Sequence, residues 1–339
     1  MVNLGLIGLG TWGKNVLRNF VSLPQCKVLL ACDSNPDQIK KVQPTYPGID
    51  FTHKMEEVLQ HKKIDAVVIV TPPASHFELA KQALLNDKDV FVEKPMVLEV
   101  ERGKEILELS EKKKKILMVG HIMEYHPATL KLKEIMKKGE LGKIYYLYAT
   151  RVNLGKVRDI ENALWSFAPH DISMILYLLD KEPHSVSATG ECYIQKDKGI
   201  EDVVFVTMHF EDGIMAHVHV SWLDPHKERK LTIVGDKKMA VIDDMQSSEK
   251  IRIYDKGVQT KLDYNTYGEF LSLRFGDILI PKLDDSSEPL KAECQHFLEC
   301  VGERKTPRSD GNDGLRVLKA LAAAQKSLEM GGTPLKIEY

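Results

Sequence analysis

The sequence predicts two domains of different fold class: an α/β domain with a doubly wound parallel sheet, then an α+β domain with a large, mostly antiparallel sheet. The length of 339 residues is about twice that of an average domain. Short apolar runs alternate with helical patterns through the first third of the chain, whereas strand-like runs follow one another directly between residues 185 and 254. We expect the domains to be residues 1–121 and 122–339.

The composition is that of a folded, soluble protein. Hydrophobic residues make up 43% and charged residues 28%, which excludes extended disorder. The 47 basic and 49 acidic residues leave a net charge of −2, too small to attract nucleic acid or an anionic membrane. Five cysteines without a C-x-x-C pair argue against a disulfide framework. Because we find neither a signal-peptide pattern nor a membrane-length apolar run, we expect a cytoplasmic protein with no nucleic-acid or membrane partner.

The first domain is expected to contain five strands separated by amphipathic helices. The expected strands are residues 4–8, 28–32, 66–70, 90–92 and 116–119. Residues 13–23 place Val16, Phe20 and Leu23 on one helical face, and residues 77–85 repeat this spacing. Strands that alternate with helices in this way form a parallel sheet covered on both faces.

The second domain is expected to combine separate helices with a run of strands. The helices are residues 128–138, 170–179, 290–300 and 314–330, and the strands are residues 144–152, 185–190, 203–210, 214–222, 229–234, 239–242 and 251–254. Asp310 or Asn312 is expected to begin the last helix and Gly331-Gly332 to end it. Strands in direct succession indicate antiparallel pairing.

A glycine motif, Gly8-Leu9-Gly10-Thr11-Trp12-Gly13, directly follows the first strand and opens the first helix. Gly8 permits a tight turn, Gly10 lets the backbone approach a pyrophosphate, and Gly13 allows the helix to pack closely on the strand. The helix N-terminus adds free N–H donors and a favourable dipole. This is the fingerprint of a Rossmann-type dinucleotide-binding domain.

Asp33 supports this interpretation. It ends the second strand about 20 residues after the motif, the spacing of a carboxylate that binds the adenosine ribose hydroxyls. A carboxylate repels a 2′-phosphate, and Ser34 and Asn35 follow it rather than an arginine. The expected cofactor is therefore NAD rather than NADP.

Two more segments lie at the carboxyl edge of the sheet, where ligands of such folds bind. Thr71-Pro72-Pro73 either stiffens a wall beside the cofactor or forms an ordinary turn. Glu93-Lys94-Pro95 places a lysine where it can orient a reacting hydroxyl and stabilise negative charge on its oxygen. Composition alone favours a surface lysine at position 94.

In combination, the glycine motif, the acid that ends strand two, Thr71-Pro72-Pro73 and Glu93-Lys94-Pro95 resemble the Gfo/Idh/MocA family of oxidoreductases. The resemblance covers essentially the whole chain. It implies that Lys94 is catalytic, that Glu93 lies near the nicotinamide ribose, and that a histidine of the second domain acts as acid or base. We assign that role to His170, since a histidine at a helix start is kept neutral by the helix dipole.

The chain departs from the family at one position. Many relatives have an aspartate four residues before the catalytic histidine, where this chain has Ser166. Either Asp171 supplies the orienting charge, or Lys94 and His170 act with the cofactor alone. The segment between the domains passes the active-site cleft in the family, so the resemblance implies that His121 and Tyr125 contact substrate.

The stretch from Arg151 to Arg158 contains three basic residues and Asn153 just before the expected catalytic helix. This cluster either binds a diphosphate or a carboxylate of a bulky substrate, or it is a solvated strand end. With the Leu164-Trp165 and Pro169-His170-Asp171 segments it is similar to the nucleotide-sugar branch of the family.

We therefore expect oxidation of a sugar secondary alcohol, at C3 of a UDP-N-acetylhexosamine, with hydride transfer to NAD. Two alternatives remain. One is dehydrogenation of myo-inositol or a simple sugar. The other is a regulator that binds the dinucleotide without chemistry.

Metal binding is not expected, because His217, His219 and His226 have no suitably spaced carboxylate or cysteine beside them. A long open sheet promotes association unless it is paired, and members of the family commonly bury it against another subunit. We expect a homodimer or homotetramer.

Overall fold

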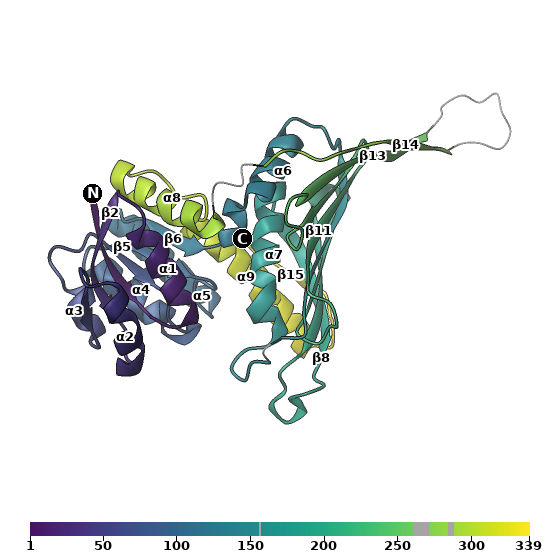
Figure 1. The fold of residues 1–339 in the computed structure, drawn as a ribbon. Coiled ribbons are helices and arrows are strands. Elements are labelled where there is room, and N and C mark those ends of the chain that lie inside the picture. The colour runs from purple at the N-terminus through teal and green to yellow at the C-terminus, as the bar shows by residue number, and fades with distance from the viewer. Residues whose placement is uncertain (156, 261–270, 284–287) are drawn as a thin grey trace. The chain divides into compact units, whose positions relative to one another are not determined.

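The computed structural model describes residues 1–155, 157–260, 271–283 and 288–339, and it divides into two compact units (Figure 1). Unit 1 comprises Met1–Tyr125 and Ser286–Lys319, and unit 2 comprises His126–Asp285 and Ala320–Tyr339. The chain first passes from unit 1 to unit 2 after Tyr125, close to the boundary expected after residue 121. The sequence prediction differs for residues 286–319, which it assigned to the second domain.

Unit 1 contains a six-stranded sheet in the order β3-β2-β1-β4-β5-β6, and all neighbouring strands are parallel. The strands are β1 (Val2–Ile7), β2 (Cys26–Cys32), β3 (Asp50–Thr52), β4 (Ala66–Ile69), β5 (Asp89–Glu93) and β6 (Leu117–Gly120). The expected doubly wound sheet is confirmed. The short strand β3 was not predicted, because two of its three residues are polar. The strand order reverses between β1 and β4, and ligands of such sheets bind at this switch point.

The helices of unit 1 come from both ends of the chain (Figure 1). They are α1 (Thr11–Val21), α2 (Pro36–Val42), α3 (Met55–Leu59), α4 (His76–Leu85), α5 (Val100–Lys113), α8 (Pro289–Glu303) and the first part of α9 (Gly311–Glu329), with short 3-10 turns η1 (Gln43–Thr45), η2 (Pro73–Ser75) and η3 (Ile122–Tyr125). Asp310 Oδ1 accepts a hydrogen bond from Asp313 N at the start of α9, and Gly331 and Gly332 follow its end with positive φ, as expected.

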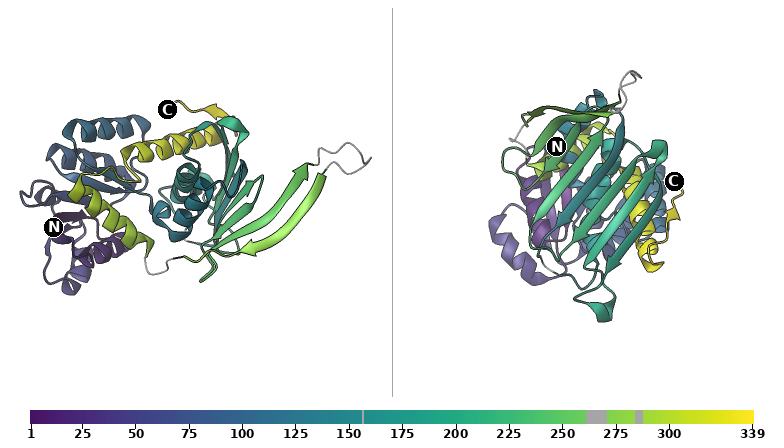
Figure 2. Two further views of the ribbon diagram at one scale, coloured as in Figure 1. Left: turned by 90° about the horizontal axis from the view of Figure 1, so that it is seen from above. Right: turned by 90° about the vertical axis from the view of Figure 1, so that its right-hand side faces the viewer.

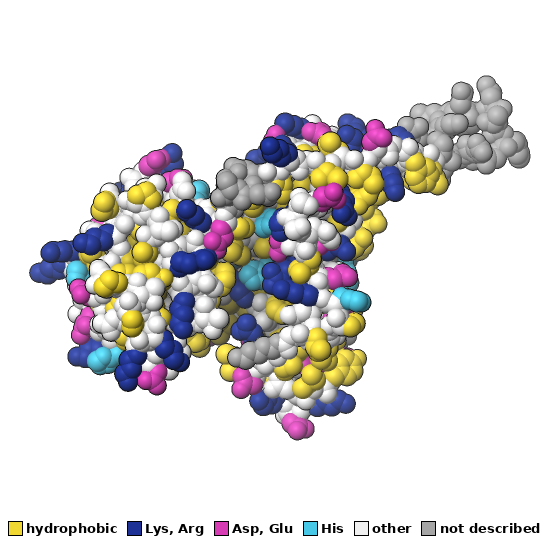
Figure 3. All heavy atoms as spheres, in the orientation of Figure 1, with side chains coloured by type: hydrophobic (Ala, Val, Ile, Leu, Met, Phe, Trp, Pro, Cys, Tyr) yellow, Lys and Arg dark blue, Asp and Glu magenta, His cyan; other side chains and the backbone are white. Residues whose placement is uncertain are grey.

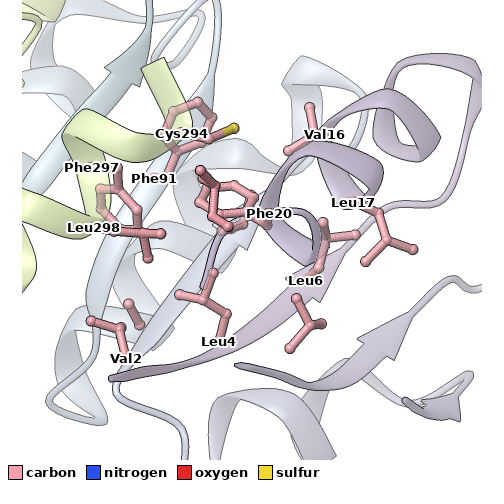
Figure 4. Close-up of a cluster of buried hydrophobic side chains, with 14 of the residues drawn as sticks. Val2, Leu4, Leu6, Val16, Leu17, Phe20, Phe91, Cys294, Phe297 and Leu298 are labelled. Carbon is pink, nitrogen blue, oxygen red and sulfur yellow. The ribbon is translucent and has the colours of Figure 1, made fainter. Parts of the chain in front are cut away.

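Hydrophobic packing explains why residues 286–319 join unit 1. Phe297 of α8 contacts Phe20 of α1 and Phe91 of β5 edge to face, with ring centroids 6.2 and 5.6 Å away (Figure 4). Cys294 and Leu298 of α8 lie in the same buried cluster. Aromatic pairs in this geometry add about 0.5–1.5 kcal/mol beyond their buried area. The apolar face of α8 is thus buried by elements more than 200 residues earlier in the chain.

Unit 2 contains a nine-stranded sheet in the order β14-β13-β12-β11-β7-β10-β9-β8-β15. The strands are β7 (Ile144–Val152), β8 (Pro183–Glu191), β9 (Val203–Phe210), β10 (Met215–Ser221), β11 (Glu228–Gly235), β12 (Met239–Asp243), β13 (Ile251–Thr260), β14 (Leu271–Leu279) and β15 (Leu335–Lys336). Only β7 and β10 pair in parallel among the strands described, so the expected mostly antiparallel sheet is confirmed (Figure 2).

The second part of α9 belongs to unit 2, where Ser327 Oγ accepts a hydrogen bond from Ala188 N of β8 at 2.9 Å, and two further helices pack on the sheet. Helix α6 (Pro127–Lys137) contacts β12, and α7 (Ala163–Leu179) contacts β7, β9 and β10. Short 3-10 turns η4 (Lys196–Lys198) and η5 (Glu211–Gly213) occur in the connections between strands. Helix α7 carries His170 and Asp171, two of the expected site residues.

The start of α7 corrects the sequence prediction. The prediction began this helix at His170, but the structure begins it at Ala163, where the Asn162 side chain caps it by accepting a hydrogen bond from Trp165 N at 3.1 Å. Pro169 lies inside the helix. His170 is therefore more than one turn from the N-terminus, and the helix-dipole argument for a lowered pKa does not apply, because that effect fades within the first turn.

The surface agrees with the near-zero net charge. Basic and acidic side chains are interspersed over the visible face of each unit (Figure 3). All five cysteines are unpaired. Across the ranges that the structure describes, every helix is too short or too polar to cross a bilayer.

Candidate functional site

The glycine motif forms a tight turn between β1 and α1 with an open approach to its middle. Gly8 has a φ of +107°, and a Cβ there would lie 2.4 Å from the Val70 carbonyl oxygen. A Cβ on Gly13 would lie 2.0 Å from the Gly8 carbonyl oxygen, so neither position accepts a side chain. A Cβ on Gly10, in contrast, would meet no described atom within 4 Å.

This open position precedes the N-terminus of α1. Gly10 is the N-cap residue and has an extended conformation, and its helix begins without a side-chain cap. Thr11 and Trp12 follow and are exposed. Free backbone N–H groups beside an open approach fit the pyrophosphate of a dinucleotide.

Asp33 stands beside the same turn, at the end of β2. Its Oδ2 accepts a hydrogen bond from Leu9 N at 2.7 Å, and its Oδ1 accepts one from Asn35 N at 2.8 Å. The residue is half-buried. Each carboxylate oxygen retains further acceptor capacity. The acid is therefore held in place by backbone donors and can still accept hydrogen bonds from a ribose.

Trp12 connects the glycine motif to the Glu93-Lys94-Pro95 segment. Its indole Nε1 donates to Glu93 Oε1 at 2.5 Å, and Glu93 Oε2 accepts from Lys94 N at 3.1 Å. Burial raises the pKa of Glu93, while the bonds from Trp12 and Lys94 oppose that rise. Two segments that the sequence assigned separately to the cofactor site thus share one hydrogen-bonded carboxyl group.

His76, which the sequence left without a role, joins the ends of β4 and β5. The side chain is fully buried, with Nε2 2.9 Å from the Thr71 carbonyl oxygen and Nδ1 2.8 Å from the Pro95 carbonyl oxygen. Burial lowers the pKa of His76, although both carbonyls favour its protonated form. His76 therefore links the backbone that follows β4 to Pro95, directly after the half-buried Lys94. The sequence did not predict these two contacts, because a histidine at the polar start of a helix is usually a surface residue. Pro72, by contrast, is exposed beside Thr71.

His121 and Tyr125 lie in enclosed surroundings within unit 1. Each is 2% exposed; Tyr125 Oη lies 2.9 Å from Ser309 Oγ, and His121 Nδ1 lies 2.7 Å from Asp313 Oδ2. Burial lowers the pKa of His121, but Asp313 and Glu124 outweigh burial and raise it to about 9. These contacts do not support the expectation that His121 and Tyr125 contact substrate. Both side chains turn into the unit to satisfy their polar atoms.

In unit 2, Arg151 of β7 and Asp171 of α7 form a buried bidentate ion pair. Arg151 Nε donates to Asp171 Oδ2 at 2.7 Å, and the guanidinium NH2 group donates to Oδ1 at 3.0 Å. The side chains are 8% and 1% exposed. These contacts do not support the expected diphosphate contact of Arg151 or the expected orienting role of Asp171 toward His170, because both side chains are buried and bonded to each other.

The remaining expected residues of unit 2 differ in accessibility. Arg158 is exposed and pairs with Glu161 at 2.8 Å, and His170 is half-buried. Asn153 is half-buried, and its Oδ1 has no hydrogen-bond partner among the described residues. Ser166 is buried one turn before His170 on α7. Lys156, the third basic residue of this stretch, lies outside the described residues.

Known proteins resemble the chain over nearly its full length. Scyllo-inositol 2-dehydrogenase (NAD(+)) of Bacillus subtilis is 27% identical over 349 residues, covering 99% of this chain and 96% of that protein. UDP-N-acetylglucosamine 3-dehydrogenase of Acidithiobacillus ferrooxidans is 24% identical over 331 residues, covering 96% of each.

Solved structures show the same fold. The UDP-N-acetylglucosamine 3-dehydrogenase structure from Acidithiobacillus ferrooxidans superposes with a TM-score of 0.80 at 23% identity, covering 97% of this chain and 98% of that one. Scyllo-inositol dehydrogenase from Lactobacillus casei, with bound NAD(H) and scyllo-inositol, gives a TM-score of 0.80 at 20% identity, covering 99% of each chain.

Two family descriptions match successive parts of the chain. Residues 2–121 match the oxidoreductase family with an NAD-binding Rossmann fold, GFO_IDH_MocA, and residues 129–241 match the GFO/IDH/MocA C-terminal domain. The glycine turn, Asp33 and the Trp12–Glu93 bond lie within the first match. The chain therefore belongs to the GFO/IDH/MocA family of oxidoreductases, with an NAD-binding Rossmann domain at its N-terminus.

Proposed function

We propose that this protein is an NAD-dependent dehydrogenase that oxidises a secondary alcohol of a sugar, at C3 of a UDP-N-acetylhexosamine. One observation carries the dehydrogenase proposal. Glu93 accepts hydrogen bonds from both Trp12 of the glycine motif and the Lys94 backbone, which couples the dinucleotide loop to a half-buried lysine. Relatives named as NAD-dependent or sugar dehydrogenases cover the same length of chain.

The chemistry divides between the two catalytic residues. NAD, when bound, supplies the hydride acceptor. Lys94 holds the alcohol oxygen and stabilises the negative charge that develops on it, and His170 takes the hydroxyl proton. His76 and Glu93 act as positioning residues, because they fix the backbone on either side of Lys94.

The nucleotide-sugar substrate is supported by the similarity to UDP-N-acetylglucosamine 3-dehydrogenase and by the exposed guanidinium group of Arg158. A free inositol is the second candidate. The buried Arg151–Asp171 pair favours it, because this pair removes one of the cations available for a diphosphate. The inositol dehydrogenases among the relatives favour it as well.

The substrate is tested by following NADH formation with UDP-N-acetylglucosamine, its uronate, myo-inositol, scyllo-inositol and glucose. The purified protein is first checked for reduced cofactor carried through purification, with a 2-oxo acid added where it is found. We expect the highest kcat/KM with a UDP-N-acetylhexosamine, and we expect Arg158→Ala to raise KM for that substrate. A higher kcat/KM with an inositol, unaffected by Arg158→Ala, would assign the second candidate.

The catalytic role of Lys94 has its own test. Lys94→Met is expected to lower turnover by roughly 10²- to 10⁴-fold while NAD still binds, since general acid–base and charge stabilisation are worth about that much. Lys112→Met, an exposed lysine of α5, is the matched control and keeps full turnover. Full turnover by Lys94→Met would reject the role. NADH formation with any polyol also separates the enzyme from a regulator that only binds the dinucleotide.

We also propose that the protein is a homodimer or homotetramer that covers the open face of the large sheet. Helices pack on one face of the sheet (Figure 2). Tyr146, Tyr148 and Phe205 on the other face are 39–41% exposed. Phe205 stacks on His219 with ring centroids 4.3 Å apart, which gives this face a flat aromatic layer. A contiguous exposed apolar patch on a sheet is typical of a protein interface. A monomeric mass by light scattering at micromolar concentration would contradict this assignment.

A further inference from the structure

A buried cluster of three potential ligands lies inside unit 1, apart from the residues assigned to catalysis. It joins His121, at the end of β6, Glu124, in η3, and Asp313, in the first turn of α9. His121 Nδ1 lies 2.7 Å from Asp313 Oδ2 and 3.4 Å from Glu124 Oε1, and the three ligand atoms all lie within 4.8 Å of one another. The residues are between 0% and 3% exposed.

Glu124 provides an independent sign that a group is missing from this cluster. Its carboxyl is fully buried, and neither of its oxygens has a hydrogen-bond partner with good geometry among the described residues. Leaving such a group unsatisfied costs about 1–3 kcal/mol, and more for a charged group. Buried polar atoms without partners in a native protein call for an explanation, and an ion or a water molecule is the usual one.

We propose that His121, Glu124 and Asp313 bind one divalent transition-metal ion of the Zn²⁺ type at a structural site within unit 1. An imidazole nitrogen and two carboxylate oxygens form a donor set that Zn²⁺ accepts, whereas Mg²⁺ and Ca²⁺ prefer oxygen ligands alone. Tetrahedral bonds of about 2.0 Å place neighbouring ligand atoms about 3.3 Å apart. The His121–Glu124 separation already matches this value, and the His121–Asp313 pair has to open by about 0.6 Å.

The surroundings support Asp313 as a ligand. Arg316 NH2 donates to Asp313 Oδ1 at 2.6 Å, and Asp313 N donates to Asp310 Oδ1 at 2.9 Å. These bonds leave Oδ2 directed at His121. Outer partners of this kind orient ligating carboxylates in metal sites. The bound ion would join the β6–η3 segment to the start of α9, and His121 and Asp313 in these two parts of unit 1 are 192 residues apart in sequence.

The test is a zinc titration of the full-length protein after treatment with a chelator, in competition with a chromophoric chelator. We expect one tightly bound Zn²⁺ per chain and a higher thermal midpoint of unfolding in its presence. Glu124→Gln removes one ligand with little change of shape, so it is expected to weaken zinc binding at least tenfold. Glu108→Gln, an exposed residue of α5, is the matched control with unchanged affinity.

X-ray absorption at the zinc edge of the loaded wild-type protein gives a second readout that does not depend on a variant. One imidazole nitrogen among oxygen donors is expected. Two or more imidazoles, or a sulfur donor, would place the ion at other histidines or cysteines and overturn the proposal. It is likewise overturned if wild-type protein binds no stoichiometric zinc, which would leave a hydrogen-bonded cluster, or if Glu124→Gln binds zinc as tightly as wild type.

Discussion

Removing the Arg151 guanidinium should destabilise unit 2 far more than removing an exposed arginine. Arg151→Met keeps most of the side-chain volume but leaves Asp171, which is 1% exposed, without its two hydrogen bonds of 2.7 and 3.0 Å. Breaking a buried ion pair from one side costs about 3–5 kcal/mol, because the remaining charge stays buried and unpaired. We expect a loss of that size in the free energy of unfolding.

The matched control is Arg158→Met. Arg158 also pairs with a carboxylate, but its side chain is 49% exposed, and exposed pairs contribute about 0–1 kcal/mol. The double variant Arg151→Met/Asp171→Leu removes both buried charges, and such replacements are often neutral or stabilising. The double variant should therefore recover most of the stability that Arg151→Met loses.

Urea unfolding followed by tryptophan fluorescence measures these differences, because Trp165 and Trp222 both lie in unit 2. The reasoning is refuted if Arg151→Met costs no more than Arg158→Met, or if the double variant is as unstable as the single one. The comparison also bears on the substrate. A raised KM in an Arg151 variant does not by itself identify a diphosphate contact, because a disturbed α7 raises KM as well.

Three further outcomes follow from the geometry of the two units. Gly13→Ala should weaken NAD binding about tenfold, or 1.4 kcal/mol, in a calorimetric titration, because the new methyl group would lie 2.0 Å from a backbone oxygen of the same turn; unchanged affinity would argue against the tight turn. His76→Leu leaves two carbonyl oxygens without their partner, so we expect a loss of about 1–3 kcal/mol for each in urea unfolding and a lower kcat, and a variant with wild-type stability would contradict the bridging role. Burial raises the pKa of Asp244, but His126 and Lys250 outweigh burial and lower it below its ordinary value of 3.8. A group with a lowered folded-state pKa stabilises above the unfolded value and loses this contribution as the pH falls. The stability difference between wild type and Asp244→Asn should thus be full at pH 7 and shrink below about pH 4, and a constant difference down to pH 3 would refute it.

Local sequence patterns predicted most of the elements. The apolar runs of β7 and β9 gave both strands with the bounds that the structure has, and the glycines that end α9 stop it where expected. The predicted start of α7 at His170 was wrong, because Asn162 caps the helix two turns earlier and Pro169 lies inside it. A proline in a helix removes one hydrogen bond, and the packing of α7 on the sheet compensates for this loss.

Some residues of the candidate site could be predicted from local sequence, and others could not. The glycine turn, Asp33 and the Glu93-Lys94-Pro95 segment could be predicted, because each depends on residues that are close together in sequence and on the edge of one sheet. The roles of His76, His121 and Arg151 could not, because their partners are 19, 192 and 20 residues away. A buried polar side chain takes whichever partner the fold brings to it.

By itself, the sequence determined the two fold classes, the dinucleotide loop and the family resemblance, because periodicity, glycine spacing and strand ends are local properties of the chain. Only the tertiary structure decided that α8 and the start of α9 complete unit 1, that Arg151 and Asp171 neutralise each other, and that His121 faces two carboxyl groups. These outcomes depend on which surfaces meet when the chain folds. The cost of burying an unpaired charge, or of leaving an aromatic face exposed to water, then determines which contacts persist.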